Sequence, residues 1–144
     1  MGNVGHFVSN HWLLCAAFIV VLLAIFYVEA RSAGVGSATS LTPPMVTRAI
    51  NHEQAVIVDI RDANAFRDGH IVGAINVPMS EWETQQNRLQ KYKSKPVIIA
   101  DAMGQKSQAY VSKLSKAGYE GVKFLNGGIN GWRNAKLPLV KGSK

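Results

Sequence analysis

Residues 97–107, VIIADAMGQKS, decide the fold of this chain. The four apolar residues from Val97 to Ala100 are typical of a fully buried strand, and the polar turn after them leads into a helix with a periodic apolar face. In α/β folds, ligands bind in such loops, between the carboxyl end of a parallel strand and the amino end of a helix. The free N–H groups of the loop and the helix dipole both favour an anion. The first loop residue, Asp101, is itself an anion, so this candidate anion site has a carboxylate at its base.

Strands and helices alternate on both sides of this loop. Thr42, followed by proline, predicts a helix start with a hydroxyl at the N-cap. The β-branched run 56–60 predicts a buried parallel strand, Ser80 is expected to cap another helix, and residues 122–125 are expected to form the last strand. This alternation predicts one α/β domain over residues 41–144, with a mostly parallel central sheet flanked by helices.

An apolar run, residues 12–28, precedes this domain and contains no charged side chain. As a helix it would be about 26 Å long, which is the lower limit for crossing a hydrocarbon core. Trp12 and Tyr27 lie where interfacial aromatic residues are expected. We therefore expect a single transmembrane helix in contact with the lipid bilayer, after a short tail of residues 1–11 and before a flexible linker of residues 29–40.

A cleaved secretory signal is the alternative interpretation of the apolar run. The tripeptide Val28-Glu29-Ala30 resembles a cleavage site with small residues at its ends. Against this alternative, residues 1–11 contain no Lys or Arg, and the apolar run exceeds the usual length of about 7–15 residues. These features favour a permanent anchor over a signal peptide.

The basic residues all lie on one side of the apolar run. All 16 Lys and Arg residues follow it, and the net charge of the chain is +7. The positive-inside rule predicts a single-pass protein of the inner (cytoplasmic) membrane, with its C-terminal domain in the cytoplasm. The charge alone would also fit nucleic-acid binding, but no basic motif with interleaved aromatic residues accompanies it. We expect no nucleic-acid partner, since attraction to anionic lipid headgroups explains the charge more simply.

Several polar and glycine-containing landmarks follow one another along the domain at characteristic spacings. They are Asp59, Arg61, Gly69, His70, Gly73, Asn76, Pro78, the loop from Asp101 to Ser107, Gly127, Gly128 and Trp132. Together these landmarks resemble the rhodanese-like (thiosulfate sulfurtransferase) domain across residues 41–144. A membrane span followed by one such domain resembles the YibN type of rhodanese-like protein.

The resemblance implies a specific chemistry for the loop. In active members of the family the loop begins with Cys, whose thiolate takes a sulfane sulfur from a donor such as thiosulfate and passes it to an acceptor. Asp101 occupies the Cys position, Gly104 that of the loop glycine, and Lys106 that of a basic residue which is commonly Arg. A carboxylate is far less nucleophilic than a thiolate, cannot store a sulfane sulfur and would repel thiosulfate. The only cysteine of the chain, Cys15, lies in the apolar run.

We therefore interpret the loop as an anion loop without a catalytic residue. Its members are Asp101, Ala102, Met103, Gly104, Gln105, Lys106 and Ser107. Asp101 is expected either to accept hydrogen bonds from the N–H groups of its own loop or to pair with Lys106. A phosphoaspartate mechanism would need a second, metal-binding Asp nearby, and the loop has none, so we expect neither a metal nor a cofactor.

The other landmarks are expected to be structural. His70 is expected to be packed and hydrogen-bonded, and Asp59 and Arg61 to bond to the backbone or to each other. The sequence therefore predicts a non-catalytic binding or scaffolding module with a protein partner at the membrane. The alternative is a sulfurtransferase, or another anion-handling enzyme that uses an unrecognised group.

Overall fold

A computed structural model describes residues 11–142, with side chains at residues 11–28 and 39–142. The chain divides into two compact units, residues 1–38 and residues 39–144. Each unit is described by itself below.

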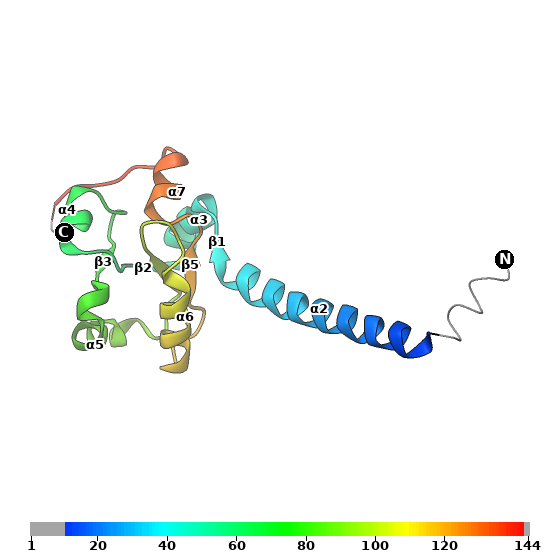
Figure 1. Ribbon diagram of the computed structural model, residues 1–144. Helices are drawn as coiled ribbons and strands as arrows, with labels where there is room; N and C mark the ends of the chain where they lie inside the picture. The colour runs from blue at the N-terminus through cyan, green and yellow to red at the C-terminus, as the bar shows by residue number, and fades with distance from the viewer. Residues whose placement is uncertain (1–10, 143–144) are drawn as a thin grey trace. The chain divides into compact units, whose positions relative to one another are not determined.

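The larger unit is built on a five-stranded sheet (Figure 1). Its strands are β1 (Ser40–Leu41), β2 (Val56–Asp59), β3 (Ile75–Asn76), β4 (Val97–Ala100) and β5 (Lys123–Leu125). Their order in the sheet is β1-β5-β4-β2-β3, and every neighbouring pair is parallel. The predicted α/β fold with a parallel central sheet is confirmed, and β4, which precedes the loop, is the middle strand.

Helices cover both faces of this sheet. They are α3 (Pro43–Glu53), α4 (Ala63–Asp68), α5 (Trp82–Gln85), α6 (Ser107–Lys116) and α7 (Gly128–Asn134), with the 3₁₀ turns η1 (Met79–Glu81) and η2 (Gln86–Tyr92). Val97 and Ile99 pack in one core with residues of α5, η2 and α6, whereas Ile98 and Ala100 pack in a second core with residues of α3 and α7. Because β4 is buried on both faces, its sequence is continuously apolar instead of alternating.

Two helix starts were expected from the sequence, and one of them is where it was predicted. Thr42 is the N-cap residue of α3, with prolines in the first turn, although its side chain makes no capping hydrogen bond. The prediction that Ser80 caps a helix is wrong. The tight turn η1 begins at Met79, where the Glu81 N–H donates to the Pro78 carbonyl oxygen at 2.9 Å, so Ser80 already lies inside the turn.

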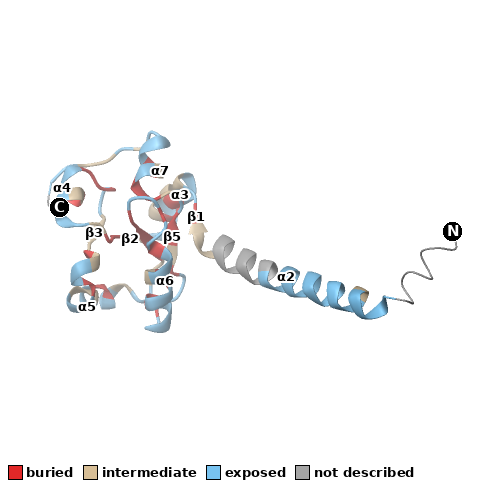
Figure 2. Ribbon diagram, in the orientation of Figure 1, coloured by how far each residue is buried: buried red, intermediate tan, exposed pale blue. Residues whose placement is uncertain are grey.

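The smaller unit contains the long helix α2 (Trp12–Thr39). Its backbone is helical through the segment 29–39, where the composition predicts a flexible linker. Extending an existing helix by one residue costs less than starting a new one, so small residues such as alanine and serine can continue it. From Trp12 to Val28 its large apolar side chains are exposed, each by 48% to 73%, and Figure 2 shows this part of α2 as exposed. Within the described part of the chain, no helix is long and apolar enough to cross a membrane.

Candidate functional site: the loop after strand β4

The carboxylate of Asp101 fills the loop between β4 and α6. Asp101 directly follows β4, and only 3% of its surface is exposed. Its Oδ1 accepts hydrogen bonds from the Gly104 backbone N–H at 2.5 Å and from the Ser107 hydroxyl at 3.0 Å. Its Oδ2 accepts a hydrogen bond from the Lys106 backbone N–H at 2.8 Å. The loop therefore binds an anion, and that anion is its own first residue.

All donors to this carboxylate are neutral. Lys106 contributes its backbone N–H, and no ion pair joins its ammonium group to Asp101 among the described residues. Of the two arrangements expected from the sequence, the structure has the one in which the loop N–H groups bind the carboxylate. The hydroxyl of Ser107, which is fully buried at the start of α6, was not expected as a third donor.

The Gly127-Gly128 turn packs against the backbone of the Asp101 loop. At the amino end of α7, the N–H groups of Ile129 and Asn130 donate to the carbonyl oxygens of Asp101 at 2.8 Å and of Ala102 at 3.0 Å. Gly128 has a φ of +57°, and a Cβ atom there would collide with the Asp101 carbonyl oxygen. The two backbones can approach this closely only because residue 128 has no side chain.

A second buried carboxylate lies at the end of β2. Asp59 is fully buried and pairs with Arg61, whose Nη2 lies 2.6 Å from Oδ2 and whose Nε lies 3.0 Å from Oδ1. The same Nη2 also donates to the Gly69 carbonyl oxygen at 2.8 Å. The Asn76 side-chain amide donates to the carbonyl oxygens of Asp59 and Arg61 at 3.0 and 2.9 Å. These landmark residues thus connect the end of β2 to β3 and to the end of α4.

The remaining landmark residues belong to the framework. His70 is buried, its ring stacks on Phe66 with centroids 3.7 Å apart, and its Nδ1 lies 2.8 Å from the Phe66 carbonyl oxygen. Gly73 adopts a φ of +76°, and Pro78 is buried. Trp132 is buried and donates from Nε1 to the Pro138 carbonyl oxygen at 3.0 Å.

An open cavity of about 330 Å³ lies beside the loop. From the predicted loop it is lined by Asp101, Ala102, Met103, Gln105 and Lys106, and Arg61 also contributes. The sequence analysis missed three further lining residues, Asp62, Ala65 and Met79. Asp62 and Met79 directly follow Arg61 and Pro78, so their proximity to landmark residues was the available signal.

The charges around this cavity do not favour an external anion. Asp62 caps α4, and the hydrogen bond from the Ala65 N–H, as the main cause, lowers the pKa of its carboxyl group below the usual value, so Asp62 is ionised at neutral pH. Two carboxylates, Asp62 and Asp101, therefore face one Lys106 ammonium and a guanidinium already paired with Asp59. A second anion would also find the N–H groups of Gly104 and Lys106 already bonded to Asp101.

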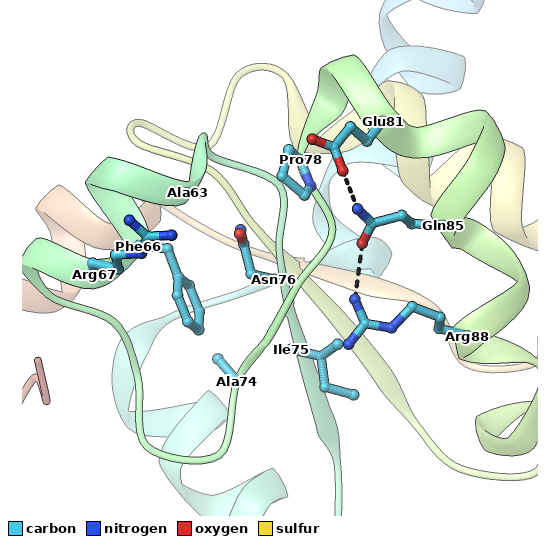
Figure 3. A pocket seen from close by; sticks show the side chains of 10 residues that line it. All are labelled: Ala63, Phe66, Arg67, Ala74, Ile75, Asn76, Pro78, Glu81, Gln85 and Arg88. Atoms are coloured by element: carbon cyan, nitrogen blue, oxygen red, sulfur yellow. Dashed lines mark hydrogen bonds between the residues drawn. The ribbon is translucent and has the colours of Figure 1, made fainter. Parts of the chain in front are cut away.

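A second cavity, of about 370 Å³, lies beside the edge strand β3 (Figure 3). One wall carries a chain of hydrogen bonds, in which Arg88 donates to the Gln85 side-chain oxygen at 2.8 Å and the Gln85 amide donates to the Glu81 carboxylate. Phe66 and Arg67 of α4 contribute to the opposite wall. No sequence pattern had indicated this cavity, because its walls come from three separate segments.

The fold and the loop together define an α/β domain with an anion loop at the carboxyl end of its central strand. Residues 42–135 match the family model of the rhodanese-like domain. The chain belongs to the rhodanese-like domain family.

Named relatives and solved structures agree with this assignment. The YibN protein of Escherichia coli (strain K12) is 38% identical over 143 residues, which cover 99% of each chain. The thiosulfate sulfurtransferase GlpE of Actinobacillus succinogenes is 31% identical, with 70% of this chain and 89% of that protein covered. A crystal structure of a rhodanese-related protein from Thermoplasma volcanium superposes with a TM-score of 0.64 at 26% identity, covering 72% of this chain and 98% of that one.

Proposed function

We propose that this protein is a non-catalytic rhodanese-like module, anchored in the cytoplasmic membrane by residues 12–28, that binds a protein partner at the cytoplasmic membrane face. The observation that carries the proposal is the Asp101 carboxylate, which accepts hydrogen bonds from two of the loop N–H groups, those of Gly104 and Lys106. In a rhodanese these groups would stabilise the transferred sulfur, as an oxyanion hole stabilises an oxyanion.

Sulfur transfer would need a nucleophile at the base of this loop. The family resemblance puts Asp101 at the position of the catalytic Cys, and a carboxylate oxygen cannot hold a sulfane sulfur for transfer. Residues 39–144 contain no cysteine, since the only one, Cys15, lies in the other unit. Thiosulfate, which is an anion, would also have to displace the negatively charged Asp101 carboxylate from its N–H donors.

The anchor is supported by the surface of α2. Its apolar side chains from Trp12 to Val28 are exposed, with no polar face among them. Contact of such a surface with water is unfavourable, so lipid or protein is expected to cover it. No helix of the described residues meets the length and apolarity of a membrane span, so the support for the anchor is this exposure. The YibN relative matches over nearly the whole chain, including this segment.

The surface around the loop offers a partner a preformed shape. Met103, at the outer side of the loop, is 60% exposed, while the backbone beneath it is held by hydrogen bonds from α7. An exposed, adaptable methionine on a rigid support, next to an open cavity, suits binding to a protein surface.

The test is the transfer of sulfur from thiosulfate to cyanide by the full chain in detergent. The unmodified protein should show no rate above buffer. Asp101→Cys should gain some activity and a thiol that is alkylated near neutral pH, because the loop N–H groups and the start of α6 stabilise a thiolate. Asp101→Ser is the matched control, since it removes the carboxylate without adding a thiol. Lys106 lacks the planar fork of arginine, so restoration should be incomplete.

Turnover by the unmodified protein would favour the alternative, a sulfurtransferase that uses a group other than a thiol. That alternative is supported by the relatives named thiosulfate sulfurtransferase, among them GlpE of Actinobacillus succinogenes. A Cys variant that is alkylated no faster than an ordinary exposed thiol would contradict the proposed role of the loop N–H groups.

A further inference from the structure

The two ends of the parallel sheet differ in charge. The loop with Asp101 lies at the carboxyl end, together with the cap residue Asp62. At the amino end lie five lysines, here called the amino-end lysines. They are Lys91, Lys93, Lys95, Lys116 and Lys123.

The topology brings these lysines together. Lys91, Lys93 and Lys95 lie at the end of η2 and in the turn that leads into β4. Helix α6 runs back from the carboxyl end of the sheet and ends at Lys116, and Lys123 is the first residue of β5. Figure 1 shows the last turn of α6 at the end of the sheet opposite the loop that follows β4.

The amino-end lysines are not neutralised by their neighbours. The Nζ of Lys93 lies 5.3 Å from the centre of the Tyr119 ring, and the Nζ of Lys91 lies 5.0 Å from that of Tyr92. Among the described residues none of the five forms an ion pair, whereas Lys113 pairs with Glu83. Two exposed carboxylates lie at the same end of the sheet, Glu53 at the end of α3 and Glu120 before β5. Arg48 lines a cavity with Glu53 and Lys123 at this end, so six cations and two anions leave a net charge of +4 there.

The chain also enters the domain at this end. β1 runs parallel to β5 and begins at Ser40, so the residue before it reaches the sheet at its amino end. Residues 29–39 connect Val28 to Ser40 and span at most about 40 Å when fully extended, or about 16 Å as a helix. If residues 12–28 lie in a bilayer, this connection keeps Ser40, at the amino end of the sheet, within that distance of its surface.

We propose that the amino end of the sheet docks onto anionic lipid headgroups, so that the loop of Asp101 and its cavity face away from the bilayer. This inference rests on the proposed membrane anchor. Electrostatic attraction acts only within about 8 Å at physiological ionic strength, so a short connection is needed to keep the lysines in range. Docking of this kind would present Met103 and the cavity to a cytoplasmic partner.

The experiment measures energy transfer from a labelled cysteine to labelled headgroups, with the full chain in nanodiscs. In a Cys15→Ser background, the donor is placed by Ser94→Cys, between two amino-end lysines, or by Asn64→Cys on α4, beyond the carboxyl end of β2. Adding phosphatidylglycerol to phosphatidylcholine should raise the transfer from residue 94 and not from residue 64. High salt should remove this rise.

Charge reversal supplies the matched control. The triple variant Lys91→Glu, Lys93→Glu and Lys95→Glu should lose the response to phosphatidylglycerol. The triple variant Arg133→Glu, Lys136→Glu and Lys141→Glu changes the net charge equally at exposed positions elsewhere and should keep it.

Four results would overturn the inference. An anchored protein whose energy transfer ignores phosphatidylglycerol would contradict docking while leaving the anchor intact. Equal losses in both triple variants would show that net charge acts without a docking surface. Displacement of the domain from the headgroups by a nucleic-acid oligonucleotide at low concentration would identify the lysines as a nucleic-acid site instead. A full chain that does not enter nanodiscs and is released by alkaline carbonate would refute the anchor itself.

Discussion

Asp59 and Asp101 lie at the carboxyl ends of neighbouring strands, and their carboxylates are stabilised in different ways. In the sheet Asp59 is paired with Ala100, the residue before Asp101, and both aspartates are buried. Asp59 meets a guanidinium, with Arg61 Nη2 at 2.6 Å from its Oδ2. Asp101 meets two backbone N–H groups and a hydroxyl, all neutral.

This difference separates a carboxylate balanced by a cation from one held by neutral donors alone. The pair of Asp59 and Arg61 is complete, because each charge is balanced by the other and the guanidinium also bonds to the Gly69 carbonyl oxygen. The donors around Asp101 carry no net charge, so they would accept other anions of suitable size and position. In the folded protein these donors hold the carboxylate of their own loop.

The largest effect is expected from breaking the charged pair. Asp59→Asn leaves a largely buried guanidinium without its counter-charge and should lower the free energy of unfolding by about 3–5 kcal/mol. Asp101→Asn leaves only neutral donors imperfectly paired and should cost about 1–3 kcal/mol. Both values can be measured by guanidinium unfolding of the full chain in detergent, followed by the fluorescence of the buried Trp82 and Trp132 in a Trp12→Phe background.

The exposed pair of Glu83 and Lys113 is the control for this comparison. Its atoms lie 3.4 Å apart with side chains 76% and 51% exposed, so Glu83→Gln should change the free energy of unfolding by less than about 1 kcal/mol. Equal losses in the free energy of unfolding for Asp59→Asn and Asp101→Asn would mean that the Arg61 guanidinium does not make the first site more sensitive than the second.

The next effect concerns the backbone that supports the Asp101 loop. Gly128→Ala adds a Cβ against the Asp101 carbonyl oxygen at a φ of +57°, so the loop or α7 has to move. We expect a loss of about 2–4 kcal/mol in the free energy of unfolding, from overpacking and from the left-handed backbone. The variant should also slow thiol alkylation in an Asp101→Cys background, because the N–H groups would no longer be aligned.

Gly73→Ala provides the comparison for the backbone term alone. Gly73 has a φ of +76°, but nothing lies within 4 Å of the position of an added Cβ. Its cost should be about 1–2 kcal/mol, without an effect on alkylation at residue 101. If both alanine variants lower the free energy of unfolding equally, the close approach of Gly128 to the loop does not contribute to stability.

Local patterns in the sequence predicted most of the sheet and the position of the loop. The apolar run before Asp101 predicted a buried parallel strand because both faces of β4 are covered. Hydrogen bonds from the loop N–H groups to Asp101 were also predictable, since donor and acceptor lie within five residues of each other.

Contacts between distant segments could not be predicted in this way. Gly128 was among the landmark residues of the sequence, but its contact with the Asp101 carbonyl depends on how α7 packs beside β4. Ser80 looked like a helix cap, but the tight turn η1 already begins at the residue before it, Met79. The cavity beside β3 has walls from α4, β3 and the segment from η1 to η2, and no local pattern describes such a junction.

The smallest expected effect comes from Asp62, which repeats the neutral-donor arrangement of Asp101 at the surface. Its Oδ1 accepts hydrogen bonds from the N–H groups of Asn64 and Ala65, each at 3.0 Å. The bond from Ala65 is the main cause that lowers the pKa of Asp62 from its ordinary value of 3.8. Because the pKa is lower in the folded state than in the unfolded state, ionised Asp62 stabilises the fold above the ordinary value, and this contribution is lost as the pH falls through the folded pKa.

Asp62→Asn tests this because asparagine keeps a capping oxygen but does not titrate. At neutral pH the variant should be slightly less stable than the unmodified protein, since the charge at the amino end of α4 is lost. As the pH falls below 3.8, the two stabilities should converge, because protonation removes the same charge from Asp62. Guanidinium unfolding at a series of pH values measures this difference directly. A difference that stays constant with pH would show that the oxygen caps α4 equally well with or without its charge. The charge of the exposed Asp62 would then add nothing to its hydrogen bonds with neutral donors, and the comparison with Asp101 would apply only to a buried carboxylate.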